Sequence, residues 1–177
     1  PVAGGAVVNL VSQDTTRGMR LLPNVALVGT APLEKVGVGI LEIQSDSSAY
    51  TGVATVRVGT LAISAAGSFK GVKTLNCLGR VVTATATGYG GNEFGMGALR
   101  VSAAGGANDK LADDATLTLS RGSFDYRPVA NSAETMGRVD VETWGVLGGS
   151  GTAGGVLTLG DDDGFKNRRF AFGVISV

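Results

Sequence analysis

Residues 79–122 read GRVVTATATGYGGNEFGMGALRVSAAGGANDKLADDATLTLSRG, and they set the expectation for the whole chain. Residues 81–87 alternate in polarity and are rich in β-branched side chains, which suit a pleated, half-buried surface. After a glycine-rich turn, residues 94–101 form a second apolar run, and residues 115–119 (ATLTL) are apolar at every second position. The stretch predicts three strands joined by two loops, with no helical periodicity.

The rest of the chain follows the same pattern. A short helix is expected only at residues 131–136 (NSAETM), where Asn131 or Ser132 could cap it. Short strands separated by glycine-rich turns predict an all-β fold, a sandwich or small barrel-like domain of short antiparallel strands with Gly-rich loops. The further predicted strands are residues 25–29, 36–43, 53–58, 61–63, 69–75, 138–147, 156–159 and 170–177.

Two pairs of segments resemble each other internally. Residues 36–43 and 94–101 share an apolar-Gly-apolar-Gly opening, and residues 54–58 match 115–119, with a possible third copy at 156–159. The number of residues between similar segments differs between the two pairs, and it differs again for the third copy. The spacing therefore argues against a regular solenoid. Convergent β-patterning would explain the similarity equally well.

Composition excludes several functional classes. The 177 residues include 29 Gly, no His and a single cysteine, and 15 basic residues balance 15 acidic ones. Without histidine, the Ser-His and Cys-His nucleophile pairs and most transition-metal sites are absent. Without a basic block, nucleic-acid binding is not expected. We expect Cys77 to be a small buried hydrophobe, and the bulkiest residues to be core: Phe94, Phe124, Tyr126, Trp144 and Phe172.

No apolar run is long enough to span a membrane, and residues 1–5 lack the features of a secretory signal. The sequence therefore predicts no membrane association and synthesis in a cytoplasm.

Two local motifs are interpreted as ordinary loops. Residues 149–154 satisfy G-x-G-x-x-G, but a strand rather than a helix follows, so they predict a flexible hairpin loop and no nucleotide site. Asp161, Asp162 and Asp163 could hold a hard cation, yet Asp-Gly is an ordinary hairpin turn, so no metal is predicted and ion binding stays open. We expect no cofactor and no catalytic residue.

The chain is divided into three parts: an N-terminal arm at 1–20, a β-domain at 21–124, and a C-terminal β-extension at 125–177 that could belong to the same domain. The arm is either an edge strand with a surface loop or a segment that orders on a partner. Lys166–Arg169 is the densest basic spot, either a local charge pair or a dock for an acidic surface. The candidate partner contacts are Val7, Val8, Leu10, Arg17, Lys166, Arg168 and Arg169.

Residues 79–88 (GRVVTATATG), 94–98 (FGMGA) and 115–119 (ATLTL) resemble the capsid cement, or head decoration, proteins of tailed bacteriophages. The resemblance covers residues 25–122, and the ending at 168–177 is similar to that of a lambdoid head-stabilising protein. It implies a structural virion protein that is made in the host cytoplasm, binds the exterior of an expanded capsid, often as a homotrimer, and bridges neighbouring copies of the major capsid protein.

Two alternatives remain. One is a phage fibre or tail module, or a bacterial surface adhesin, that binds a receptor or glycan. The other is an enzyme that uses two carboxylates, which is not expected, because no two carboxylates are paired in a way that singles them out.

Overall fold

The computed structural model of this protein describes residues 6–9, 18–64, 66–79, 97–103, 109–142, 145–149, 154–160 and 168–172. These residues form fifteen β-strands, and no helix occurs among them. The predicted all-β class is therefore confirmed.

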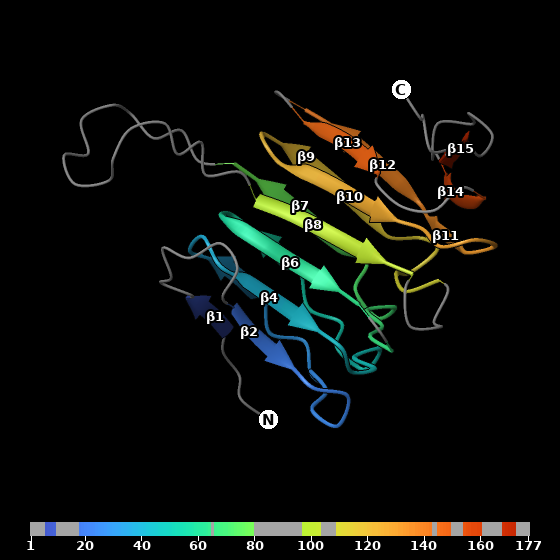
Figure 1. Cartoon of the computed structure of the whole chain (residues 1–177). Coiled ribbons are helices and arrows are strands. Elements are labelled where there is room, and N and C mark those ends of the chain that lie inside the picture. Colours follow the sequence, from blue (N-terminus) through green and yellow to red (C-terminus); the bar gives the residue numbers. More distant parts are fainter. Residues whose placement is uncertain are drawn as a thin grey trace.

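Twelve of the strands form two six-stranded sheets in which every pairing is parallel (Figure 1). Sheet A runs in the order β1 (Ala6–Asn9), β3 (Leu33–Val36), β5 (Ala54–Val56), β7 (Thr74–Leu78), β9 (Thr116–Ser120) and β12 (Arg138–Val141). Sheet B runs in the order β2 (Gly18–Leu21), β4 (Ile40–Ile43), β6 (Gly59–Ile63), β8 (Gly97–Ser102), β10 (Ser123–Arg127) and β13 (Val146–Gly149).

The chain alternates between the two sheets, so each pair of successive strands forms one coil of a β-solenoid. Ala54 pairs with Leu33, and Leu75 with Ala54, so positions 33, 54 and 75 stack at equal intervals of chain. The predicted antiparallel sandwich or barrel is wrong. Alternation along a strand shows that one face is buried, but it carries no information on whether the neighbouring strand is parallel or antiparallel.

The unequal offsets between similar segments argue correctly against a regular repeat, but they do not exclude a solenoid whose coils differ in length. Ile40 pairs with Thr60, and Thr60 with Ala98, so the similar segments 36–43 and 94–101 are separated by two coils. The first of these coils runs from position 40 to position 60, and the second, much longer, from position 60 to position 98. Because the repeat length is uneven, the period is hidden in the sequence.

A third, three-stranded sheet, sheet C, contains β11 (Ala133–Met136), β14 (Gly155–Leu159) and β15 (Arg168–Phe172). β11 and β14 are parallel, whereas β14 and β15 form the one antiparallel pair among the described strands. β13 and β14 belong to different sheets, so these two strands do not form the hairpin that the sequence predicts across residues 149–154. Residues 150–153 of this segment lie outside the described residues.

The helix predicted at 131–136 is wrong, because this segment contains β11. Glu134 and Met136 are buried while Thr135 between them is half-buried, which is the two-residue period of a strand. Asn131 adopts a left-handed conformation (φ 61°), and Ser132 Oγ accepts a hydrogen bond from Val129 N at 3.0 Å. These two residues, which the sequence suggests as a helix cap, form a turn before a strand.

The core lies between the sheets, where every second residue of a strand points inward. Phe124, Tyr126 and Cys77 are buried as predicted, and Tyr50 stacks on Phe69 with ring centroids 5.5 Å apart. Burial raises the pKa of the Cys77 thiol to about 12. The side chains of Phe94, Trp144 and Phe172 lie outside the described part of the structure, as does the predicted strand at 81–87.

The domain boundaries stay a prediction. β1 and β2 are the edge strands of sheets A and B at one end of the solenoid, and β12 and β13 are those at the other end.

Candidate functional site: a charged surface on sheet B

The predicted contact residues fall at the ends of the sheets or outside the described residues. Val7 and Val8 lie in β1, which pairs with β3, and Arg168 and Arg169 lie in β15, which pairs with β14. These pairings do not bring the two groups together. The predicted contacts at Leu10, Arg17 and Lys166, and the possible ion site at Asp161–Asp163, lie outside the described residues.

A row of charged side chains crosses the outer face of sheet B instead. Parallel pairing in register places Arg20, Glu42, Ala62, Arg100 and Asp125 side by side on successive strands. They project outward because the residues on either side of them in β4 and β8 are buried. The row therefore carries a charge on four of these five strands and a methyl group on the fifth.

The charges pair on each side of Ala62. Arg20 Nε lies 2.6 Å from Glu42 Oε2. On the other side, Arg100 Nε and Arg127 Nε both donate to Asp125 Oδ2, at 3.1 and 2.8 Å. Two guanidinium groups thus share one carboxylate, which leaves an excess positive charge on this side.

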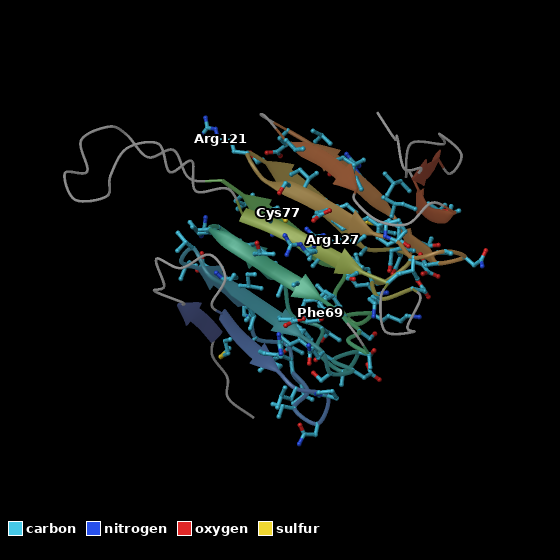
Figure 2. The ribbon with its side chains drawn as sticks, viewed as in Figure 1. Phe69, Cys77, Arg121 and Arg127 are labelled. Carbon is cyan, nitrogen blue, oxygen red and sulfur yellow. The ribbon has the colours of Figure 1, made fainter. Side chains whose placement is uncertain are left out.

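A pit of about 230 Å³ lies over Ala62. Glu42 and Arg100 stand two strands apart, roughly 9.5 Å between backbones at the usual strand spacing, and each forms its ion pair on the side away from Ala62, Glu42 with Arg20 and Arg100 with Asp125. Figure 2 labels Arg127 at the end of β10 on this face, with Arg121 at the opposite end of that strand. The lining residues are Ile40, Glu42, Ala62, Ile63, Ser64, Arg100, Ser102 and Arg127.

Glu42 forms the negative wall of the pit. Burial alone would raise the pKa of its carboxyl group, but hydrogen bonds from Ser64, Arg20 and Gln44 outweigh burial and hold this pKa below its usual value. Glu42 Oε1 accepts hydrogen bonds from Ser64 Oγ at 2.5 Å and from Gln44 Nε2 at 3.2 Å. Glu42 is therefore ionised and fixed in place at neutral pH.

Two buried ionisable residues serve the fold rather than a surface. Lys35 Nζ donates to the carbonyl oxygens of Val36, Gly37 and Val58. Glu134 accepts hydrogen bonds from Lys110 N at 2.7 Å and Leu111 N at 2.9 Å. Both side chains are almost completely buried, so neither is available to a substrate.

Sequence reasoning did not identify the pit residues. They come from four strands of sheet B, and Glu42 and Arg127 are far apart in the chain. A signal existed: a charged residue occupies the second outward position of β2, β4, β8 and β10. It becomes visible only once the strands are aligned in their parallel register.

Within the described ranges, no group of three or more His, Cys, Asp or Glu side chains could hold a metal ion. The same residues contain no helix long and apolar enough to cross a membrane. In comparisons with known proteins, no family model, no curated protein and no solved structure matches the chain.

Proposed function

We propose that the chain is a structural binding module of a fibre or a surface adhesin, which presents the outer face of its solenoid to a receptor or glycan. The observation that carries this proposal is the parallel stacking of successive coils in sheets A and B. In a solenoid, each repeat contacts only its neighbours, and the stacked repeats create an extended lateral surface suited to binding.

The solenoid also supports a place in a longer assembly. Among the described residues, its end strands, β1 and β2 at one end and β12 and β13 at the other, are paired on one side only and present strand edges along the same axis. Exposed apolar side chains occur at both ends, among them Met19 and Leu22 at the first and Val141 and Val146 at the second. Open strand edges are templates for further pairing. A fibre built from stacked coils would use both ends in this way.

Capsid decoration is the second candidate. It rests on the resemblance of residues 79–88, 94–98 and 115–119 to cement proteins. Its partners would be the major capsid protein and two further copies of this chain, on the exterior of a virion. The enzyme hypothesis has no support from the described surface, where the one carboxylate facing the pit, Glu42, is held ionised by its hydrogen bonds.

One experiment separates the two candidates. The purified chain is tested for saturable binding to an array of cell-surface glycans and, in parallel, for co-sedimentation with expanded capsids, while light scattering gives its mass in solution. Glycan binding without capsid binding supports the adhesin or fibre module. A trimer that saturates capsids at fixed stoichiometry and ignores glycans would overturn it in favour of decoration.

A further inference from the structure

The pit over Ala62 has a composition that matches one class of ligand. On one wall, Arg100 and Arg127 each use Nε to contact Asp125 Oδ2, so the remaining nitrogens of both guanidinium groups are not used in those contacts. The Arg127 side chain is 42% exposed and that of Arg100 30%, so solvent reaches both. A guanidinium group binds a carboxylate through parallel hydrogen bonds, and such charge-assisted bonds are strong.

The opposite wall accepts and donates hydrogen bonds. Glu42 is a fixed acceptor for hydroxyl groups, and the hydroxyls of Ser64 and Ser102 line the same pit. The floor at Ala62 is apolar. A ligand that complements this arrangement carries a negative group at one end and hydroxyls at the other, with an apolar face between them.

The volume restricts the size of the ligand. At about 230 Å³, the pit is smaller than the roughly 300–1,000 Å³ of sites for drug-sized molecules. It has room for a single sugar ring. Because it is open on the outer face of a sheet, that ring can be one unit of a longer polysaccharide.

We propose that the pit binds one acidic sugar unit, with its carboxylate on Arg100 and Arg127 and its ring hydroxyls on Glu42 and Ser64. This inference rests on the proposed adhesin or fibre function and names the chemistry of the glycan. The position of Ala62 is central, because a longer side chain there would occupy the space of the sugar.

The test compares galacturonate with galactose, two sugars of the same ring that differ in whether carbon 6 is a carboxylate. Each is titrated into the 15N-labelled full chain, and amide shifts at Ala62 and Arg100 are followed. Galacturonate is expected to give saturable shifts at these amides, and galactose is expected to bind at least tenfold more weakly. Ala62→Leu and Arg127→Gln should each weaken galacturonate binding at least tenfold.

Arg57→Gln is the matched control, because Arg57 is an exposed arginine that forms an ion pair with Glu34 next to sheet A, away from the pit. It should leave the affinity unchanged. Equal shifts with both sugars, or equal weakening by Arg57→Gln and Arg127→Gln, would overturn the inference. Glycan-array binding that Ala62→Leu leaves intact would also overturn it while sparing the proposed function, whereas capsid binding alone would remove the proposed function itself.

Discussion

Lys35 is a positive charge inside the solenoid, where a corner of the chain turns from sheet A to sheet B. Its ammonium group donates to the carbonyl oxygens of Val36 at 3.0 Å, Gly37 at 2.6 Å and Val58 at 3.1 Å. Lys35 therefore joins two successive corners. A methionine of similar length could fill its space but could not donate to these oxygens.

We expect Lys35→Met to lower the free energy of unfolding by about 1–3 kcal/mol, because three partly buried carbonyl oxygens would lose their donor. Urea denaturation followed by circular dichroism measures this. Lys73→Met is the control: its ammonium group is exposed and pairs with exposed Asp114, so the substitution should leave stability nearly unchanged. A similar loss in both variants would contradict the role of Lys35.

The same residue gives a pH dependence. Burial lowers the pKa of Lys35 from 10.5 to about 8. Between these two values the unfolded chain binds more protons than the folded one, so this residue makes stability rise as pH increases from 8 to 10.5. The difference in stability between the wild type and Lys35→Met should therefore widen over this range. A constant difference would contradict the burial of a protonated amine.

Glu134 should show the opposite dependence at lower pH. Burial raises the pKa of this carboxyl group from 4.5 to about 7, against the hydrogen bonds from Lys110 N and Leu111 N. For an acid with a raised pKa, the stabilising contribution is complete below 4.5 and is lost as pH rises through about 7. Removing the ionisable group should remove this slope.

We expect Glu134→Gln to destabilise the chain by about 1–3 kcal/mol at pH 5, because one of the two amide donors loses its acceptor. The loss of stability should be smaller at pH 8, because the buried charge of ionised Glu134 already destabilises the wild-type chain at that pH. Urea titrations at both pH values give the two differences. Glu142→Gln, at an exposed position, is the control. A larger loss of stability for Glu134→Gln at pH 8 than at pH 5 would contradict the raised pKa of Glu134.

At the scale of the strand, some elements can be predicted from the sequence and others cannot. The predictions at β9 and β14 are correct because their residues alternate between apolar and polar types. β10 is missed, although Phe124 and Tyr126 alternate with polar residues, because Pro128 indicates a turn there. The segment 25–29 is predicted as a strand, but only Gly29 makes a bridge, to Tyr50.

The run 36–43 shows why strand ends are hard to place from the sequence. The pattern predicts one strand, but the run contains the end of β3 and all of β4, which lie in different sheets. Gly37 has a φ of 81° and makes the corner between them. A glycine between apolar residues is compatible with a continuous strand or with a sharp turn. Only the packing of neighbouring coils decides between them.

Close packing of successive coils requires a residue without a side chain at Gly97, at the start of β8. A Cβ atom there would overlap the carbonyl oxygen of Val56. Gly97→Ala should therefore destabilise the chain by about 1–3 kcal/mol, as overpacking does in cores. The measurement is the midpoint of urea unfolding.

Gly148 in β13 is the matched control, since the nearest atom to a Cβ there is Phe124 O at 3.9 Å. Gly148→Ala lies in the same sheet but should be neutral within about 0.5 kcal/mol. If both alanine variants behaved alike, the close approach of β8 to the end of β5 at Val56 would be refuted.

At the scale of the molecule, the all-β class can be predicted from the sequence but the solenoid cannot. Class follows from local alternation, whereas the direction of pairing depends on which strands become neighbours. The dependence on which strands become neighbours also explains why the site cannot be predicted from the sequence. Glu42, Ala62 and Arg100 are ordinary residues singly, and they form a pit only because parallel register places them on successive strands. The basic spot at Lys166–Arg169, the clearest local signal, stays a prediction.

A solenoid should tolerate the loss of a whole coil, whereas a sandwich or barrel would not tolerate the loss of two strands. Residues 54–74 make up one coil, because Leu75 pairs with Ala54, and Ala54 with Leu33. Their deletion would place Leu75 opposite Leu33 and β8 beside β4, with the buried faces still turned inward. We expect a folded chain with a parallel-sheet circular dichroism spectrum and a single, lower unfolding midpoint.

Deletion of residues 54–64 is the control, because it removes the same two strands, β5 and β6, but not the length of a coil. The chain returns from sheet B to sheet A in one segment before β5 and in another before β7. After this deletion the two return segments would follow each other directly, and β7 would be out of register with its neighbours. This variant should lose its cooperative transition. If the shorter deletion folded and the whole-coil deletion did not, coil length would not set the register, and the stacking on which the proposed fibre or adhesin function depends would fail with it.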